Sequence, residues 1–536
     1  MTASRLKLDA PNYKYKGLFM SQAVPHDSIL DLVLDHCYSS PGATAIVVGD
    51  DVVTYQELRN KIYKVSAYIQ GRGVAIGSVI AIIQNNIGDA LASMLGCLHA
   101  GCIYCPIDPF MPSAKIQRTL AVANVEFVLS EQGLPYIWKI NDPEFVHYKE
   151  LPTPASCAAL TQRYHPLAYI MFTSGSTGDP KGVAIGHANL IEIFKGWDAV
   201  YQLKKLKRHL QFASLSFDVF AGDWLRGLCS GAIIYVPSST EKHVVESLAD
   251  FIVAHQIECA EFTPIILREL CGYALRNDVK LSSFKLLIAG SDVMRVREFK
   301  DVRKIISDDC RLVFSYGTTE TTIDSTYFEA THEALSKLQN DAPLPIGVPF
   351  PCTLITILKD DGTHTDLHEV GELYIGGGGV GQGYLHNDVR TSGRYLRRLP
   401  LGRHARWYRT GDLASYDGQN FNLHGRADAR IKVPGKLIDL TELEAHLRAH
   451  EDILECVATT TPHDLNKKIL LLVKLKPTSA KLKREAIAQH VSSLEDYPVS
   501  SNDIYFAKDL PVTMSGKIDR VEANRIAITL QAGAAK

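Results

Sequence analysis

A loop rich in hydroxyl groups and glycine follows an apolar run in Tyr169–Val183, whose sequence is YIMFTSGSTGDPKGV. The run Tyr169–Phe172 predicts a buried strand, and the following nine residues, Thr173–Lys181, end in a lysine. Glycines let backbone N–H groups approach an anion closely, and the hydroxyl groups and the lysine ammonium add donors and positive charge. The segment therefore predicts a phosphate-binding loop. It differs from a Walker A loop, because Gly182 rather than serine or threonine follows the lysine.

Length and composition narrow the class of protein. At 536 residues the chain exceeds one ordinary hydrophobic core, so we expect at least two domains. The formal net charge of −2 gives no argument for nucleic acid, and no segment has the ~18 consecutive apolar residues of a membrane helix. The N-terminus lacks the apolar stretch of a signal peptide. Eleven scattered cysteines favour free thiols in a reducing, cytoplasmic compartment. Cys102 and Cys105 have no second pair at ligand spacing, so we interpret them as packing residues.

Helix and strand patterns alternate along most of the chain, which predicts an α/β fold with parallel sheets. After an irregular leader at residues 1–25, helices are predicted at Ser28–Cys37, Thr54–Ile69 and Asp89–Ala100, and strands at Ala45–Val48 and Val79–Ile83; Phe251–His255, Leu286–Ala289 and Leu312–Phe314 continue the alternation. The glycines of Gly371–Gly383 predict tight turns between short strands. We expect a large N-terminal domain of layered α/β subdomains at residues 26–427 and a small, mobile α+β domain at residues 428–536.

Nine segments together resemble the motifs of the adenylate-forming (AMP-binding) superfamily, in the order found in that family. The resemblance is greatest to the amino-acid adenylation domains of nonribosomal peptide synthesis, and it covers roughly Ser28 to Arg520. Besides the phosphate loop, the segments are VTYQEL (Val53–Leu58), GCIYCPIDP (Gly101–Pro109), FASLSFDVF (Phe212–Phe220), SYGTTETT (Ser315–Thr322), GELYIGGGGVGQGYL (Gly371–Leu385), YRTGDL (Tyr408–Leu413), GRADARIKVPGKLIDLTELE (Gly425–Glu444) and LPVTMSGKIDR (Leu510–Arg520).

The resemblance implies that a carboxylate attacks the α-phosphorus of ATP and expels pyrophosphate. Both reactants are anionic, so the site must supply positive charge and a metal. Glu320 matches the Mg²⁺ carboxylate, Tyr316 offers a ring for adenine, and Asp412 matches the acid that binds the ribose hydroxyls. The implied catalytic residues are Lys517, Glu320, Thr173 and Lys181. The implied ATP-binding residues are Thr173, Ser174, Gly175, Ser176, Thr177, Gly178, Lys181, Ser315, Tyr316, Gly317, Thr318, Thr319, Asp412, Arg426 and Lys517.

The C-terminal motifs imply a domain that moves. The Lys517 ammonium would bridge the substrate carboxylate and the ATP α-phosphate, which otherwise repel each other. Lys517 could act only when the small domain folds over the large one, and Asp428 matches the hinge for that motion. Pro434 stands where the family usually carries arginine, which is a departure in the loop used for thiol transfer.

Asp218 matches the acid that binds the α-ammonium of an amino acid, and acyl- and aryl-acid ligases usually lack it. The other side-chain pocket positions aligned through the motifs are Val219, Gly222, Glu261, Leu287, Ala289, Ser315, Ile323 and Asp324; Lys517 would reach the substrate carboxylate. Two acids in one pocket, Glu261 and Asp324, repel each other unless a cation lies between them, and Gly222 would leave depth for a long side chain. The pattern resembles the specificity code for ornithine-like side chains. The alternative is that one acid points to solvent or binds a backbone group.

We therefore expect ATP-dependent activation of an ornithine- or lysine-like amino acid, with Mg²⁺, and transfer to a phosphopantetheine thiol. The carrier-protein and condensation-domain motifs are absent, so the chain is expected to be either a free-standing adenylating enzyme or an excised domain. In both cases the thiol acceptor is expected on a separate carrier protein, and neither nucleic acid nor membrane is expected as a partner. Two basic clusters, Lys204–Arg208 and Lys481–Arg484, could contact an acidic carrier protein, but the simpler interpretation is that they are solvent-exposed surface. The alternatives are adenylation of a neutral amino acid such as proline, an acyl- or aryl-CoA ligase, and a nucleotide sensor without turnover.

Overall fold

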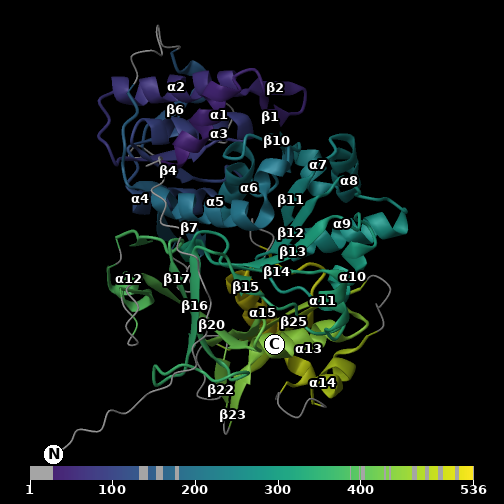
Figure 1. The fold of residues 1–536 in the computed structure, drawn as a ribbon. Helices are drawn as coiled ribbons and strands as arrows, with labels where there is room; N and C mark the ends of the chain where they lie inside the picture. Colours follow the sequence, from purple (N-terminus) through teal and green to yellow (C-terminus); the bar gives the residue numbers. More distant parts are fainter. Residues whose placement is uncertain are drawn as a thin grey trace, which may run out of the picture.

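The computed structural model describes residues 28–131, 143–152, 161–174, 180–386, 388–397, 399, 405–427, 430–433, 436–461, 468–476, 482–492, 499–512 and 518–534 (Figure 1). Within these residues the protein is a mixed α/β structure, as its sequence predicts. Most helices and the longer sheets belong to a large N-terminal part, and the elements from residue 440 onward lie together at one end of the molecule (Figure 1).

Two large sheets organise the N-terminal part. In spatial order, the nine-stranded sheet consists of β15 (Val348–Pro349), β14 (Thr326–Glu329), β13 (Arg311–Tyr316), β12 (Leu286–Gly290), β11 (Cys259–Phe262), β9 (Arg208–Leu210), β10 (Ile233–Val236), β1 (Thr44–Val48) and β2 (Asp51–Thr54). The seven-stranded sheet consists of β18 (Gly383–Tyr384), β8 (Pro180–Gly186), β7 (Leu167–Ser174), β4 (Ile103–Pro106), β3 (Val79–Ile83), β5 (Phe127–Ser130) and β6 (Phe145–His147). The central strands β11, β12 and β13 are parallel, so their carboxyl ends meet at one edge.

The helices follow the strands along the chain. They are α1 (Ile29–Ser39), α2 (Tyr55–Gly71), α3 (Ile87–His99), α4 (Ser113–Ala123), α5 (His187–Tyr201), α6 (Asp218–Leu228), α7 (Ser239–His243), α8 (Val245–Ala254), α9 (Pro264–Arg276), α10 (Val296–Arg303), α11 (His332–Ser336), α12 (Asp388–Arg394), α13 (Leu440–Ala449), α14 (Arg484–Ser492) and α15 (Arg520–Ala534). Short 3₁₀ turns lie at η1 (Tyr148–Glu150), η2 (Leu203–Lys205), η3 (Thr319–Thr321) and η5 (Ser501–Asp503).

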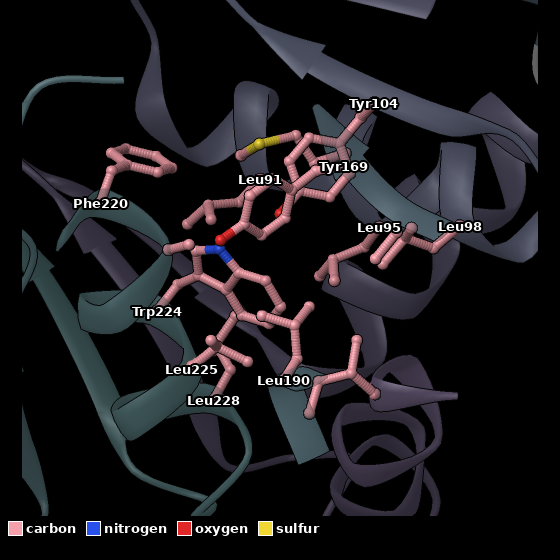
Figure 2. Close-up of a cluster of buried hydrophobic side chains, with 14 of the residues drawn as sticks. Leu91, Leu95, Leu98, Tyr104, Tyr169, Leu190, Phe220, Trp224, Leu225 and Leu228 are labelled. Carbon is pink, nitrogen blue, oxygen red and sulfur yellow. The ribbon is translucent and has the colours of Figure 1, made fainter. Parts of the chain in front are cut away.

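Helices α3, α5 and α6 meet strands of the seven-stranded sheet in one hydrophobic core. Figure 2 shows side chains of α3, of β4 and β7, and of α6 converging on the buried indole of Trp224. A second core lies on the other face of β11, β12 and β13 and includes α8, α9 and α10. Cys102 and Cys105 are buried in hydrophobic clusters, which confirms their interpretation as packing residues.

The remaining sheets are smaller. A five-stranded sheet contains β16 (Thr353–Leu358), β17 (Gly371–Gly377), β20 (Trp407–Tyr416), β19 (Tyr395–Leu396) and β21 (Phe421–Arg426), and a hairpin contains β22 (Arg430–Val433) and β23 (Lys436–Asp439). The C-terminal sheet contains β24 (Ile453–Thr460), β25 (Ile469–Leu475) and β26 (Ile504–Phe506). The two cores on this last sheet contain only residues from 440 onward, so this part has a hydrophobic core of its own. The exact domain boundary stays a prediction, since Asp428 lies outside the described residues.

Several predicted elements can be compared directly. Helix α1 begins after Ser28, and α2 begins after Thr54; both residues cap the helix through capping boxes with an acid three positions later. Of the three segments that continue the predicted alternation, Leu286–Ala289 and Leu312–Phe314 lie in strands β12 and β13, and Phe251–His255 is the end of helix α8. That apolar run is too short to distinguish a strand from a buried helix face by periodicity. The glycines of Gly371–Gly383 lie in and between β17 and β18, as expected.

Candidate active site

A pocket opens where the carboxyl ends of β11 and β13 meet the first turn of α6. Such an edge of parallel strands is the usual ligand site of an α/β sheet. The pocket is lined by Phe217, Asp218, Val219, Glu261, Ser291, Gly317, Thr318, Thr319, Ile323 and Asp324. The structure therefore brings together five of the residues predicted to bind the amino acid, namely Asp218, Val219, Glu261, Ile323 and Asp324, and it adds Phe217 and Ser291.

Asp218 is the first residue of α6 and is 6% exposed. A carboxylate in the first helical turn is stabilised by the unpaired backbone N–H groups and the helix dipole. Its Oδ2 atom accepts a hydrogen bond of 2.6 Å from the Thr319 hydroxyl, across 101 residues of sequence. The acid predicted to bind an α-ammonium thus adjoins a threonine predicted to bind ATP.

The loop that carries Thr319 has a specific backbone shape. A side chain at Gly317 would place its Cβ 1.9 Å from the Ile323 carbonyl oxygen, so only glycine fits. Thr322 and Ile323 have φ angles of 60° and 71°, a left-handed conformation that is costly for β-branched residues. The buried Thr322 hydroxyl donates to the Gly379 carbonyl oxygen at 2.6 Å and helps to hold this shape. The result is that Ile323 and Asp324 line the pocket.

Arg226 is a residue of this site that the sequence reasoning missed. Its guanidinium is 2% exposed, and its Nη2 atom lies 2.6 Å from Glu261 Oε2 and 3.0 Å from Asp223 Oδ1. Its Nη1 atom lies 3.8 Å from Asp324 Oδ2. The cation expected between two pocket acids is therefore supplied, at least in part, by the protein itself. The available signal was an arginine four residues after Gly222 and three after Asp223, on the helix that begins with Asp218.

Burial raises the pKa values of two acids in this cluster, Asp324 and Asp223. Desolvation and then the charge of neighbouring Glu261 raise the pKa of Asp324, against the opposing effect of Arg226, to about 8. The same desolvation raises the pKa of Asp223 to about 7, against the opposing charge of Arg226. Asp223 also accepts hydrogen bonds from the backbone N–H groups of Phe212 and Ala213, which favour its charged form. Asp324 accepts one from the Trp197 indole at 3.0 Å.

Two of the predicted pocket residues lie on the face of the sheet that is opposite the pocket. Leu287 and Ala289 belong to the second core, together with Phe262 and Phe314, their strand neighbours. Successive strand residues face opposite sides, so Ile288 and Gly290 share the face of Glu261 and Ser315. A Cβ at Gly290 would lie 2.6 Å from Ser315 Oγ and 3.4 Å from Glu261 Oε1. The prediction of Leu287 and Ala289 was wrong by one residue of register.

The free space that was predicted next to Gly222 for a long substrate side chain is also absent. A Cβ at this glycine would lie 3.2 Å from Nη1 and 3.3 Å from Nη2 of Arg226, so the guanidinium fills the space that the missing side chain leaves. The prediction that Gly222 opens room for a long substrate side chain was therefore wrong for this structure. The glycine instead accommodates an arginine of the same helix.

A second group of predicted residues lies between β13 and the five-stranded sheet. The Tyr316 hydroxyl donates to Asp412 Oδ2 at 2.5 Å, and Arg426 Nη1 lies 3.2 Å from Asp412 Oδ1. The pKa of Tyr316 is raised by burial and then by the neighbouring Asp412 charge, so the hydroxyl remains a donor. The ring predicted to meet adenine and the acid predicted to meet ribose are thus in direct contact, although 96 residues separate them.

Glu320 lies in the 3₁₀ turn η3, where the Tyr384 hydroxyl donates to its Oε1 atom at 2.7 Å. Tyr384 in turn contacts the Tyr408 hydroxyl at 3.1 Å. Among the described residues, no group of three or more histidine, cysteine or acidic side chains could hold a metal ion. A single carboxylate oriented by a tyrosine fits Mg²⁺, which protein sites often bind through one or two carboxylates together with substrate phosphates.

The phosphate loop is described only at its two ends. Strands β7 and β8 form an antiparallel pair in which Thr173 lies opposite Lys181, and Ser174 opposite Pro180. The hairpin therefore places the threonine and the lysine side by side at the base of the loop. Gly175, Ser176, Thr177 and Gly178 lie outside the described residues, and so do Lys517, Asp428 and Pro434.

Two family models match the chain. The model described as "AMP-binding enzyme" matches residues 34–385, and the model described as "AMP-binding enzyme C-terminal domain" matches residues 442–517. None of the described helices is both long enough and apolar enough to cross a membrane.

Curated relatives are much longer proteins. Bacitracin synthase 2 of Bacillus licheniformis is 33% identical over 506 residues, which are 92% of this chain and 19% of that protein. Gramicidin S synthase 2 of Brevibacillus brevis is 31% identical over 502 residues, which are 91% of this chain and 11% of that protein. The chain thus spans less than a fifth of the length of these two relatives.

Solved structures share the fold. A four-domain nonribosomal peptide synthetase, holo-AB3403 bound to AMP and glycine, superposes with a TM-score of 0.78 at 22% identity, over 93% of this chain and 36% of that chain. Klebsiella oxytoca NpsA in complex with 3-hydroxyanthranilyl-AMSN gives a TM-score of 0.78 at 20% identity, over 94% of this chain and 99% of that chain. At these identities the likeness concerns the fold alone.

Proposed function

We propose, from the premise that this chain belongs to the family of AMP-binding enzymes and is an adenylate-forming ligase, that it activates an amino acid as its aminoacyl-AMP. The observation that carries the proposal is the contact between Asp218 and Thr319. In this contact a buried carboxylate, suited to an α-ammonium group, lies next to the loop that we expect to meet the phosphates. The α-ammonium group of an amino acid would bring a cation to this buried carboxylate, whereas an acid substrate without an amino group would not.

In the proposed reaction a carboxylate oxygen of the amino acid attacks the α-phosphorus of ATP. The new P–O bond replaces the bond to the bridging oxygen, and pyrophosphate leaves. Thr173 and Lys181 at the base of the loop would hold the outer phosphates, while Tyr316 and Asp412 would hold the nucleoside. Glu320 would hold Mg²⁺, which neutralises phosphate charge when bound. The ammonium of Lys517 would bridge the two reacting anions once the small domain closes.

A basic side chain is the proposed substrate class. Asp223, Glu261 and Asp324 surround the guanidinium of Arg226, so among these four side chains the acids outnumber the cation when all are ionised. Glu261 and Asp324 line the pocket, and an ornithine-like ammonium between them would offset part of that excess. Their presence agrees with the resemblance to the code for ornithine-like side chains.

A neutral amino acid is the second candidate, and one observation favours it. If Asp223 and Asp324 carry protons, as their raised pKa values allow near neutral pH, Arg226 and Glu261 alone form a balanced pair. The cluster would then need no cation from the substrate.

For the second half-reaction we propose that a phosphopantetheine thiol of a carrier protein attacks the aminoacyl carbonyl and AMP leaves. Support comes from the match to the C-terminal domain model and from relatives that are peptide synthases by name. A carrier on a separate chain, and a cytoplasmic location, stay predictions.

Amino-acid-dependent exchange of pyrophosphate into ATP tests this proposal, with the proteinogenic amino acids, ornithine and simple aryl acids as substrates. We expect ornithine or lysine to give the highest rate, and Asp218→Ala to lower kcat/KM for that substrate by at least ~10²-fold. A highest rate with a neutral amino acid would favour the second candidate. Exchange that depends on an aryl or fatty acid, and that Asp218→Ala leaves unchanged, would contradict amino-acid activation altogether.

A further inference from the structure

We infer that Arg226 is a specificity-determining residue: from behind the pocket acids Glu261 and Asp324 it fills the space over Gly222 and limits the substrate to one short, singly charged basic side chain. This inference rests on the proposed function and names the substrate more closely. Arg226 is a positioning residue, because it lies behind the two pocket acids and is absent from the lining itself.

The first step of the argument is how the guanidinium is held. It lies over the indole ring of Trp197, with its carbon 4.9 Å from the ring centroid, and the same indole donates to Asp324. Planar stacking on an aromatic ring together with hydrogen bonds to carboxylates is a geometry that arginine adopts and lysine does not. The cation therefore has one fixed position beneath the pocket.

The second step concerns the two pocket acids, with which Arg226 makes different contacts. Its Nη2 atom donates to Glu261 at 2.6 Å, so this carboxylate is fixed in place. Within the described part of the chain its Nη1 atom makes no hydrogen bond, and its effect on Asp324, 3.8 Å away, is electrostatic. Glu261 is thus committed to the arginine, and Asp324 is the better placed of the two to receive a substrate ammonium.

The third step is the length of the pocket. The guanidinium occupies the volume over Gly222, as described above, and a methyl group there would already be in tight contact with it. A basic side chain entering past Asp218 therefore ends at the level of Glu261 and Asp324. Without Arg226 the pocket would extend to Gly222 and Asp223 and would contain one more negative charge.

The variant Arg226→Ala tests the inference through its exchange rates with ornithine, lysine, arginine and leucine. We expect the ratio of kcat/KM for lysine or arginine to that for ornithine to rise at least tenfold, because a longer cation can occupy the vacated volume. Guanidinium ion at millimolar concentration should restore the wild-type ratio in this variant and leave the wild type unaffected. An unchanged ratio in a folded Arg226→Ala protein, or guanidinium that raises Tm without restoring the ratio, would overturn the inference.

Two further variants keep the test decisive. Gly222→Ala pushes on the guanidinium from the helix backbone, so ornithine activation should fall more than leucine activation, and an unchanged ornithine-to-leucine ratio would count against the inference. Arg303→Ala is the matched control, since Arg303 is also buried but donates to the carbonyl oxygens of Ala330 and Cys310, away from the pocket. Its substrate ratios should equal those of the wild type.

The two failures are distinguishable. The wild-type panel alone tests the proposed basic substrate, whereas the change between wild type and Arg226→Ala tests the role of Arg226. A wild type that prefers a neutral side chain would remove the proposed substrate. If Arg226→Ala nevertheless activated cationic amino acids that the wild type does not, this result would still support the role of Arg226 in excluding them.

Discussion

At the scale of single residues, we predict that Asp324 couples substrate choice to pH. Its raised pKa means that the folded protein holds this acid protonated below about pH 8 and ionised above it. A substrate ammonium binds the ionised form better, so binding at lower pH must first expel a proton. We therefore expect the ratio of kcat/KM for ornithine to that for leucine to rise by up to about tenfold between pH 7 and pH 9.

The ratio is the appropriate measurement, because deprotonation of the α-ammonium and changes in the ATP chemistry affect both substrates. Asp324→Asn serves as the control and should give a ratio that is low and independent of pH. A wild-type ratio that falls as the pH rises would contradict this placement of the ornithine ammonium.

Some single residues could be predicted and others could not. Asp218, Glu261 and Asp324, which line the pocket, could be predicted because each lies at a fixed sequence separation from a recognisable motif. The prediction of Leu287 and Ala289 as pocket residues was wrong because the strand LLIAG is apolar on both faces. Its pattern therefore carries no information about which residues face the pocket. Arg226 was missed because two of its three acidic partners, Glu261 and Asp324, lie on β11 and after β13, and only the folded structure brings them together.

At the scale of elements, one buried acid joins three parts of the C-terminal region. Glu444 on α13 is 0% exposed and accepts hydrogen bonds from Arg520 at the start of α15 and from Arg448 one turn further along α13. It also accepts one from the backbone N–H group of Ala458 in β24 at 2.9 Å. Without Glu444 the backbone N–H group of Ala458 loses its acceptor in a buried position, and Arg520 and Arg448 lose a carboxylate partner, although Glu455 still lies 3.2 Å from Arg448.

We expect Glu444→Ala to destabilise this region by about 3 kcal/mol. Hydrogen exchange of peptides from α13, β24 and the first turn of α15 measures the loss locally, whereas exchange in the N-terminal sheets should stay at wild-type rates. Glu451→Ala, at an exposed position just after α13, is the matched control and should show wild-type protection. Equal protection in the two variants would mean that Glu444 does not join these elements.

Elements were predicted best where local chemistry marks their ends. Ser28 and Thr54 each supply a helix cap with an acid three residues later, and both helices begin where that pattern occurs. The hairpin of β7 and β8 was only partly anticipated, since the sequence indicated the strand before the phosphate loop and not its antiparallel partner. Pairing between strands is a tertiary property that a single apolar run does not encode.

At the scale of the whole molecule, the order of the nine motifs predicted the architecture better than periodicity did. The family models cover both the large part and the C-terminal part, and the C-terminal sheet has its own cores. That organisation suits a small domain that moves over the nucleotide, as the resemblance implies. The hinge at Asp428 and the reach of Lys517 stay predictions, because closure is a second arrangement of the same chain.

The central claim is that the protein converts a basic amino acid and ATP into an aminoacyl-AMP. The most direct measurement is to incubate the enzyme with ATP, Mg²⁺ and an equimolar mixture of amino acids, trap the activated acyl groups with hydroxylamine, and identify the hydroxamates by mass spectrometry. The account predicts that the ornithine or lysine hydroxamate dominates, and that no hydroxamate forms without ATP. Dominance of a neutral hydroxamate, or none from any amino acid, would contradict it.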